Sequence, residues 1–275
     1  QEERKGAKKK EEKKNMALLH HVVVVYVFSF IVTYSLAYDA EGSYCDFSSG
    51  IVSGGPVSTN IAHLLAGLIP KFEQGATFVE SSYGKGKNLV YGLAQCRGDV
   101  DQRNCLGCIH DAAQEIQSSC TNLADARIWY DFCFIRYSQE QFYSKVDTSN
   151  GVLIGNQENV TDVKSFSTDL GKLFDKINAD AIKPASGGFA TGVKDISKFD
   201  TLYGMAQCTK DLSSLSCAQC LNTAIQNFQD FCSGRKGCRV MYSTCTIRYE
   251  LYPFIFPTGS QKTPSESLTK LVVHY

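Results

Sequence analysis

Apolar residues recur at helical spacing in four segments of the chain. These segments are residues 60–72, 109–119, 163–177 and 221–231. A repeat of three to four residues is typical of a helix with one face in the core. Two other stretches are rich in aromatic and β-branched residues, which favours strands; they are residues 126–137 and 238–252. The residues before YGLAQC and YGMAQC contain glycine-bearing turns and are interpreted as hairpins. The pattern therefore predicts an α+β fold with helices on small antiparallel sheets.

The predicted elements occur twice, at a fixed offset of 112 residues. Five cysteines of the first half have counterparts at this offset, and their neighbours repeat with them: YGLAQC (91–96) becomes YGMAQC (203–208). Such a register of cysteines and flanking residues indicates a duplicated unit. We expect two domains, residues 38–144 and 150–258, followed by a polar C-terminal tail, 259–275.

The residues before the repeats predict a secretory signal. Residues 1–15 hold seven of the 28 Lys and Arg and four of the 28 Asp and Glu, and such a charged run does not fold alone. Residues 16–37 begin at a methionine, continue into an apolar stretch and end in small residues, which predicts a signal peptide cleaved after Ala37. The hypothesis is that 1–15 is a charged leader outside the natural protein. The alternative is a retained membrane anchor, but the apolar stretch falls short of the roughly 20 residues that a span needs.

Charge after Ala37 argues against a nucleic-acid partner. Beyond this residue the chain has 21 basic and 24 acidic side chains, whereas nucleic-acid binding proteins carry a basic excess. No second apolar stretch of spanning length occurs. We therefore expect a secreted, extracellular protein without a stable membrane span after cleavage, in a compartment that permits disulfides.

All twelve cysteines lie after Ala37, and the repeat constrains how they pair. The five shared cysteines leave one unpaired in each domain, so each domain needs one more. Domain 1 adds Cys45, and domain 2 adds Cys238 instead. Because Cys232 and Cys238 enclose a short glycine-containing loop, we expect these two to pair, and Cys45 to pair with Cys120, the counterpart of Cys232.

Other chemistry that cysteines carry is disfavoured. A CxxC at the head of a helix can be a redox pair, but each CxxC here has a further cysteine nine positions upstream and every domain reaches an even count. No histidine pair has zinc-ligand spacing to a CxxC. Motifs of the GxSxG or HExxH type are missing, although two carboxylates that meet in space could still hydrolyse glycosides. We expect structural disulfides, no metal, no cofactor and no enzymatic activity.

The cysteine motif carries a family resemblance. Two copies of C-x8-C-x2-C, each continued by C-x11-C-x12-C and preceded by YGLAQC or YGMAQC, resemble tandem ginkbilobin-type stress-antifungal domains. Over residues 38 to about 256 the chain is similar to the plant cysteine-rich repeat secretory proteins. The resemblance implies two helices packed on a five-stranded antiparallel sheet in each domain. It also implies the remaining disulfides, which are Cys96–Cys105, Cys108–Cys133, Cys208–Cys217 and Cys220–Cys245.

The resemblance further implies a sugar site in domain 2. Mannose-binding ginkbilobin uses an Asn after its first cysteine, an Arg before its last and a Glu after it, and the matching positions here are Asn156, Arg239 and Glu250. Amide and carboxylate oxygens accept from sugar hydroxyls while a guanidinium donates. Domain 1 has Asp46, Arg127 and Ser138 at these positions and keeps only the Arg. The alternative is that Arg239 and Glu250 form a cross-strand ion pair.

Two functions follow from the resemblance. The first is a secreted, non-enzymatic, antifungal defence protein that binds mannose-type glycans through domain 2. The second is an apoplastic or plasmodesmal interaction module without a sugar site, which binds a receptor ectodomain or a cell-wall partner, as expected of a relative of the ectodomains of cysteine-rich receptor kinases and plasmodesmata-located proteins. The sequon Asn159-Val160-Thr161 predicts N-glycosylation at Asn159.

Overall fold

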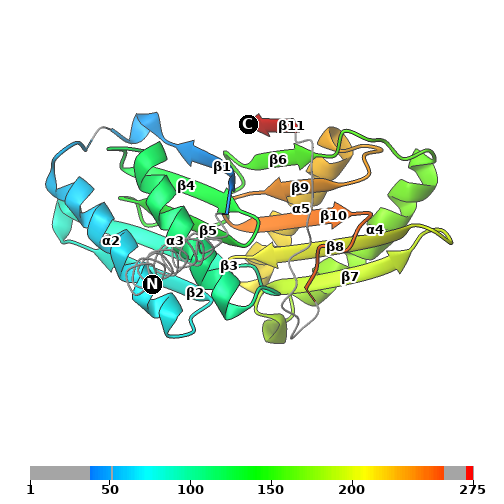
Figure 1. Cartoon of the computed structure of the whole chain (residues 1–275), viewed down its shortest axis with the longest axis horizontal. Helices are drawn as coiled ribbons and strands as arrows, with labels where there is room; N and C mark the ends of the chain where they lie inside the picture. The colour runs from blue at the N-terminus through cyan, green and yellow to red at the C-terminus, as the bar shows by residue number, and fades with distance from the viewer. Residues whose placement is uncertain (1–37, 51, 257–270, 275) are drawn as a thin grey trace, which may run out of the picture. The chain divides into compact units, whose positions relative to one another are not determined.

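The computed structural model describes residues 38–50, 52–256 and the backbone of 271–274. The predicted charged leader and signal peptide, residues 1–37, and most of the C-terminal tail lie outside the described residues. Within residues 38–256 the elements follow one order twice (Figure 1), and the two copies are called the first and the second repeat.

The first repeat has two helices on one face of a five-stranded antiparallel sheet. The sheet order is β1-β4-β5-β3-β2. Helix α2 lies over β2 and β3, whereas α3 lies over β4 and β5. The elements are β1 (Ala40–Cys45), α2 (Pro56–Glu73), β2 (Phe78–Tyr83), β3 (Val90–Cys96), α3 (Gln102–Ser119), β4 (Asp125–Tyr130) and β5 (Cys133–Ser138), with 3-10 turns η1 (Phe47–Ser49) and η2 (Gly86–Asn88).

The second repeat builds the same layers and adds one strand. Its sheet order is β11-β6-β9-β10-β8-β7, in which β11 (Leu271–His274) pairs antiparallel with β6. The other elements are β6 (Val152–Gly155), α4 (Val163–Ala181), the 3-10 turn η3 (Pro184–Ser186), β7 (Phe189–Asp195), β8 (Thr201–Cys208), α5 (Ser214–Phe231), β9 (Cys238–Met241) and β10 (Cys245–Glu250). The predicted α+β fold, with two helices on five antiparallel strands, is confirmed in both repeats. Strand β11 comes from the stretch expected to be only a polar tail, because the free edge of β6 offers unpaired backbone groups.

The helices begin where the sequence supplies a cap. The carboxylate of Asp101 accepts from the backbone N–H of Asn104 at 2.8 Å, and the hydroxyl of Ser213 accepts from that of Ser216 at 3.1 Å. Each cap satisfies an N–H group that the first turn of a helix leaves without a partner. Helices α3 and α5 therefore begin at matching positions of the two repeats.

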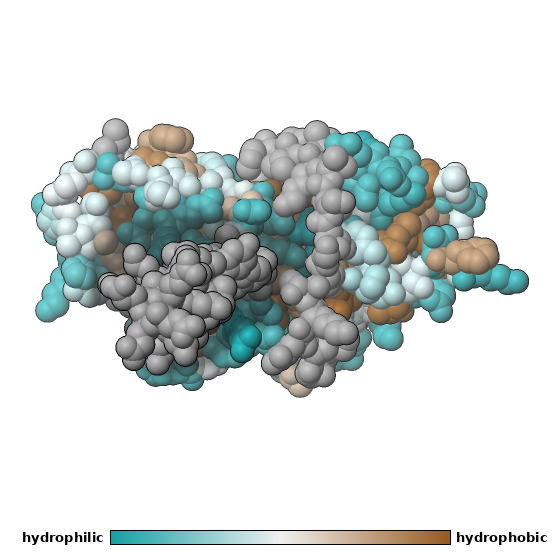
Figure 2. Space-filling view, viewed as in Figure 1, coloured by the Kyte–Doolittle hydropathy of each residue, from teal (hydrophilic) through white to brown (hydrophobic). Residues whose placement is uncertain are grey.

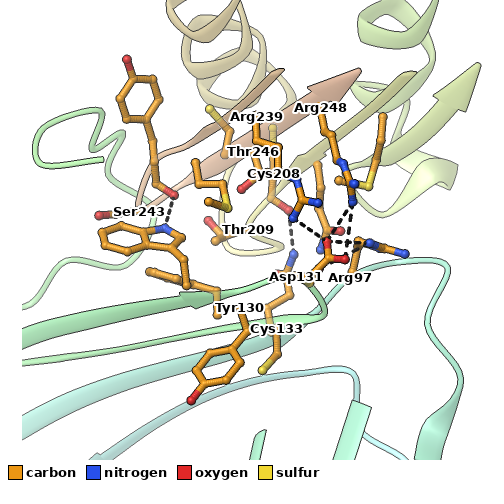
Figure 3. A pocket seen from close by; sticks show the side chains of 18 residues that line it. Arg97, Tyr130, Asp131, Cys133, Cys208, Thr209, Arg239, Ser243, Thr246 and Arg248 are labelled. Carbon is orange, nitrogen blue, oxygen red and sulfur yellow. Dashed lines mark hydrogen bonds and ion pairs between the residues drawn. The ribbon is translucent and has the colours of Figure 1, made fainter. Parts of the chain in front are cut away.

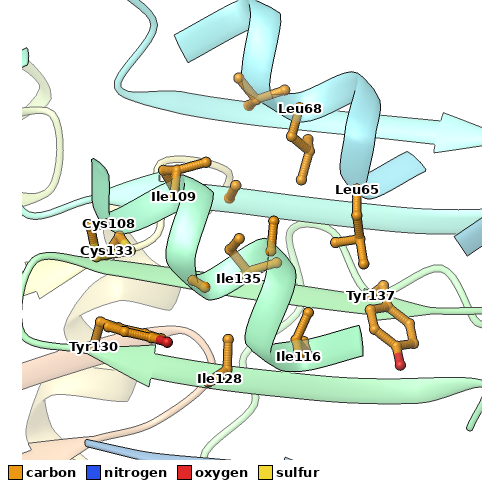
Figure 4. Packing of buried hydrophobic residues seen from close by; sticks show 14 of the residues in the cluster. Leu65, Leu68, Cys108, Ile109, Ile116, Ile128, Tyr130, Cys133, Ile135 and Tyr137 are labelled. Atoms are coloured by element: carbon orange, nitrogen blue, oxygen red, sulfur yellow. A yellow bond between two sulfur atoms is a disulfide. The ribbon is translucent and has the colours of Figure 1, made fainter. Parts of the chain in front are cut away.

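Each repeat has its own hydrophobic core between its helices and its sheet. In the first repeat, leucines and isoleucines from α2 and α3 face the apolar side of β4 and β5 (Figure 4). Labelled members of this core are Leu65, Leu68, Ile109, Ile116, Ile128, Ile135 and Tyr137. Leu65, Leu68 and Ile109 are fully buried, so the helical periodicity of the sequence corresponds to the buried face.

Six disulfides, three in each repeat, join the elements, and they are the pairs expected from the sequence. They are Cys45–Cys120, Cys96–Cys105, Cys108–Cys133, Cys208–Cys217, Cys220–Cys245 and Cys232–Cys238. In both repeats one bridge joins the end of a central strand to the start of a helix, and a second joins that helix to the neighbouring strand. The CxxC cysteines therefore bond to different partners rather than to each other.

Strand register explains why the remaining bridge differs between the repeats. Cys45 lies opposite Ala126 in the pairing of β1 with β4, and Gly155 lies opposite Cys238 in the pairing of β6 with β9. Ala126 and Cys238 are counterparts at the offset of 112 residues. Gly155 therefore occupies the place of Cys45, and the cysteine that bonds to Cys232 has moved one strand across the sheet.

Candidate functional site at the seam between the repeats

The repeats meet along a seam in which two glutamines exchange hydrogen bonds. Nε2 of Gln95, on β3, donates to the backbone oxygen of Cys208 at 2.9 Å. Nε2 of Gln207, on β8, donates to the backbone oxygen of Cys96 at 2.9 Å. Because Gln95 and Gln207 are counterparts at the offset of 112 residues, the seam has an approximate two-fold relationship.

The side-chain oxygens of the same glutamines accept hydrogen bonds across the seam. Oε1 of Gln95 accepts from the backbone N–H of Lys210 at 2.9 Å, and Oε1 of Gln207 accepts from that of Gly98 at 3.0 Å. The ring of Phe189 lies against Gly98, where an added Cβ would clash with it. Gly98 thus permits the close approach on which one of these hydrogen bonds depends.

An apolar cluster made by both repeats supports this polar contact. Its buried members are Trp129 from the first repeat and Val152, Ile154 and Met241 from the second. Nε1 of Trp129 donates to the backbone oxygen of Tyr242 at 3.1 Å, so the indole N–H has a partner inside the seam. Burial of apolar side chains from both sides is a main source of association free energy.

The segment that follows each sheet crosses to the other repeat. The backbone N–H of Asp147, after the first sheet, donates to Oγ1 of Thr244 at 3.0 Å. The backbone N–H of Phe256, after the second sheet, donates to a carboxylate oxygen of Asp99 at 2.9 Å. The Phe256 side chain is buried in the core of the first repeat. Each repeat is therefore contacted by the segment that follows the sheet of the other repeat.

Three arginines converge on Asp131 at the seam (Figure 3). Asp131 lies 2.9 Å from Arg97, 3.1 Å from Arg248 and 3.3 Å from Arg239. Burial by itself would raise the pKa of Asp131, but the charges of Arg239, Arg97 and Arg248 outweigh it and hold this pKa below its ordinary value. The carboxylate is therefore ionised and joins strands of both repeats.

Arg239 and Glu250, two of the predicted sugar residues, lie inside this charged cluster. Arg239 is 5% exposed and donates to Glu41 of β1 at 2.9 Å. Glu250 is 3% exposed and accepts from Arg248 at 3.0 Å, while its distance to Arg239 is 3.7 Å. Burial would lower the pKa of Arg239, but the carboxylates of Asp131, Glu41 and Glu250 raise it above its ordinary value. Both side chains thus have protein partners, as the alternative of a structural ion pair expects.

Asn156, the third predicted residue, directly follows strand β6. Its backbone N–H donates to the oxygen of Gly237 at 2.9 Å, as that of Asp46 donates to Asp125 at 3.1 Å in the first repeat. This shared contact makes Asn156 the structural counterpart of Asp46. The Glu250 carboxylate lies directly against Gly237, so Asn156 and Glu250 both lie next to this glycine. The side-chain oxygen of Asn156 already accepts from the backbone N–H of Glu158 at 2.8 Å.

The matching positions of the first repeat have separate roles. Arg127 pairs with Asp147 at 2.8 Å and donates to Ser243 of the second repeat at 2.7 Å. Asp46 caps η1, and Ser138 is buried. Arg127 is the counterpart of Arg239, and both reach across the seam. The arginine that the resemblance assigns to sugar binding is therefore used for contact between repeats.

The cavity at the seam is small. It measures about 60 Å³ and is lined by residues of both repeats, among them Arg97, Asp131, Arg239 and Arg248. Ligand pockets usually begin at about 300 Å³. In this structure the charged side chains that line the cavity are paired with one another.

Sequence reasoning did not single out Arg97 and Asp131. The signal was a difference between the repeats, because their counterparts are the uncharged Thr209 and Ser243. An arginine and an aspartate that appear in only one copy of a duplicated unit suggest a contact that the two copies make asymmetrically.

Two further observations concern the remaining predictions. Asn159 is exposed, with its backbone bridged to Arg235, and its glycosylation stays a prediction. Of the residues that the structure describes, none forms a helix with both the length and the apolar character that crossing a bilayer requires. The same residues contain no group of three or more His, Cys, Asp or Glu that could hold a metal ion.

Comparison with known proteins shows that both repeats match the same protein family. The family model described as salt stress response/antifungal matches residues 44–140 and 154–252. Cysteine-rich repeat secretory protein 55 of Arabidopsis thaliana is 47% identical, covering 82% of this chain and 88% of its own length. The antimicrobial ginkbilobin-2-like protein of Castanea crenata is 36% identical, covering 77% of this chain and 87% of its own. The crystal structure of the tandem DUF26 ectodomain of the Arabidopsis thaliana receptor-like protein PDLP8 has a TM-score of 0.68 at 22% identity, covers 78% of this chain and is itself covered in full, which shows a shared fold.

Proposed function

Because the chain belongs to the stress-antifungal family of secreted cysteine-rich repeat proteins, we propose that it is a non-enzymatic defence protein that binds a protein partner at the plant cell surface. The observation that carries this proposal is the seam. Its buried arginines and acidic side chains contact one another across the two repeats, which leaves recognition to the outer surface of the joined repeats.

The surface best suited to a protein partner is the β7–β8 hairpin. Val193, on β7, is 58% exposed, and Phe199, in the connection to β8, is 94% exposed. Strand β7 is the last strand of its sheet, so one side of its backbone can pair with another chain. In Figure 2 hydrophobic surface, in brown, is visible at the end of the molecule where α4, β7 and β8 lie.

A binding screen with matched variants tests this proposal. The secreted chain is immobilised and exposed to purified plant receptor ectodomains that carry tandem stress-antifungal domains. We expect saturable binding to at least one ectodomain and at least a tenfold loss in Val193→Asp/Phe199→Ser. The control is Leu215→Ser, because Leu215 on α5 is also 80% exposed but lies elsewhere. Equal binding by both variants, or no binding to any ectodomain, would contradict the proposal.

A second candidate is the binding of mannose-type glycans by the second repeat, with antifungal action. What favours it is the position of Asn156, which is the counterpart of Asp46 by its backbone contact and lies beside the Gly237 and Glu250 pair. A sugar bound here would have to replace the contacts of Glu250 with Arg248 and Arg239, which is a large rearrangement of a buried cluster.

A glycan array distinguishes the two candidates. Mannose-type glycans that bind the secreted chain, and that fail to bind Asn156→Ala, would support the second candidate. Asn156 is the residue to change because it lies outside the buried cluster, so its loss leaves the seam intact. If no glycan on the array binds the unaltered chain, the second candidate fails.

A further inference from the structure

We propose that the second repeat binds a small, flat, apolar molecule in a pocket between α4 and α5. The ligand class is one or two aromatic rings with a neutral polar substituent. This site is separate from the seam and from the β7–β8 hairpin, and it does not depend on the function proposed above.

The pocket has a continuous aromatic floor. Its volume is about 300 Å³, within the range of sites that hold small organic molecules. The ring of Phe228 contacts those of Phe174 and Tyr249, with centroids 5.2 Å and 5.0 Å apart, and Phe166 lies 5.8 Å from Tyr249. Leu170 completes the apolar lining. Such rings favour a flat apolar ligand, because they contact it by stacking and by their edges.

The corresponding region of the first repeat can be identified from two glycines. Leu64 of α2 lies against Gly92, and both Ile177 and Leu173 of α4 lie against Gly204, the counterpart of Gly92. The buried positions of the two helices coincide at an offset of 109 residues, which matches Val57, Leu64, Leu65, Leu68 and Phe72 with Phe166, Leu173, Phe174, Ile177 and Ala181. Leu64 and Leu173 therefore occupy the same place. By this alignment Phe166, Leu170 and Phe174 of the pocket correspond to Val57, Ile61 and Leu65 of α2.

In the first repeat these positions are closed by direct helix contact. Helix α2 lies close against α3, whereas α4 and α5 approach each other less closely. Ile61 of α2 and Ala113 of α3 are buried, while their counterparts Leu170 and Ile225 are only partly buried. Larger aromatic side chains in the second repeat hold its helices apart, so the same fold has an open pocket where its twin has a filled core.

The mouth of the pocket is polar and uncharged. Ser167, Gln229 and Ser233 line it and are exposed. None of the residues that line the pocket carries a charged side chain, so a buried ionic group would lack a partner. A ligand with one hydroxyl or carbonyl group at the mouth and an apolar ring inside matches this arrangement.

Gly171 gives access to the pocket from α4. It lines the pocket, and an added Cβ would have no heavy atom within 4 Å. Glycine is a poor helix former, so its place in the middle of a 19-residue helix has no local advantage. A side chain added here can enter the open space without displacing a neighbour, which makes this residue the natural point at which to block the site.

The test is a titration of the isotope-labelled secreted chain with 2-naphthol, followed by nuclear magnetic resonance. We expect saturable shifts of amides in α4 and α5. Gly171→Phe should weaken binding at least tenfold by filling the pocket. Gly171→Ala should bind as the unaltered chain does, because a methyl group leaves most of the volume free.

Each other outcome overturns the inference. It fails if no saturable shift is seen, if the shifts lie outside α4 and α5, or if Gly171→Phe binds as well as Gly171→Ala. The thermal midpoint of each variant separates a blocked pocket from a misfolded chain, and we expect Gly171→Ala to unfold at the same or a higher temperature than the unaltered chain. Should Gly171→Phe unfold early, Ile225→Trp, which enters from α5, provides the same block.

Discussion

Gln95 and Gln207 hold the two repeats together by the same interaction made twice. Each donates its side-chain amide across the seam to the backbone oxygen beside the other, at 2.9 Å in both directions. Because the residues are counterparts, a duplication placed one glutamine on each side of the contact. The seam is thus a property of the pair, and neither repeat alone contains it.

Loss of either glutamine should destabilise the chain to a similar extent. Gln95→Ala and Gln207→Ala each remove one donor and one acceptor from backbone groups at the seam, which should lower the free energy of unfolding by about 1–3 kcal/mol. Urea unfolding followed by circular dichroism measures the change. The control is Gln139→Ala, whose side chain makes one exposed hydrogen bond to Lys87 and should change stability by less than about 0.5 kcal/mol. A seam variant no less stable than this control would contradict the role of the glutamines.

Asp131 should make the stability of the chain sensitive to acid. Its pKa is lower in the folded protein than in the unfolded chain, so the unfolded chain binds more protons as the pH falls. The stabilisation is therefore complete above the usual carboxyl pKa of about 4 and is lost as the pH falls toward the lowered value.

Asp131→Asn tests this titration directly. At pH 7 we expect a loss of about 2 kcal/mol, less than for a fully buried pair, because the Asp131 side chain is 35% exposed. Below pH 4 the difference between the variant and the unaltered chain should shrink. Urea unfolding at pH 7, 5 and 3 measures both effects, and parallel pH profiles of the two proteins would show that Asp131 does not titrate as proposed.

Glu250 should behave as a structural residue. Glu250→Gln leaves Arg248 and Arg239 with one buried carboxylate fewer, so we expect the free energy of unfolding to fall by roughly 3 kcal/mol. The matched control is Glu158→Gln, because Glu158 pairs with Lys236 at the surface, where its side chain is 69% exposed, and exposed pairs contribute little. Chemical unfolding of both variants gives the comparison. Equal stability of Glu250→Gln and Glu158→Gln would instead favour a role for Glu250 in binding.

The disulfide between Cys232 and Cys238 should form equally well when the cysteine on β9 is replaced by one on the neighbouring strand β6. Gly155 occupies the place of Cys45, and a Cβ built on it lies 3.9 Å from the sulfur of Cys232. Gly155→Cys combined with Cys238→Ala should therefore form a disulfide between the new thiol on β6 and Cys232. Because this bridge closes a much longer loop than the native separation of 6 residues, the chain-entropy model predicts about 2 kcal/mol of added stability. Peptide mapping without reduction identifies the bridge, and a free thiol at either position would show that the alignment is wrong.

Much of the fold could be predicted from the sequence because the patterns that specify it are short-range and occur twice, once in each repeat. The helical spacing of Ile109 and Ile116, together with five cysteines in one register, predicts the helices, the duplicated unit and the pairs Cys45–Cys120 and Cys232–Cys238. The five-stranded sheet and the other four disulfides were implied by the family resemblance. Strand β11 could not be predicted, because it depends on the free edge of β6 rather than on its own pattern.

The surroundings of the candidate site could not be predicted from the sequence. Arg239 and Glu250 lie 3.7 Å apart on neighbouring strands, yet Arg239 is also paired with Glu41 and Asp131, which belong to the first repeat. A pattern within one repeat contains no information on what the other repeat places against it. The difference between Asp131 and its counterpart Ser243 is the feature of the sequence that comes nearest to indicating this contact.

Calorimetry of the secreted chain tests the central claim, that the two repeats form one structural unit through their seam. The account predicts a single unfolding transition in which the calorimetric and van't Hoff enthalpies agree. Two resolved transitions, or a calorimetric enthalpy about twice the van't Hoff value, would show that the repeats unfold independently and would contradict it.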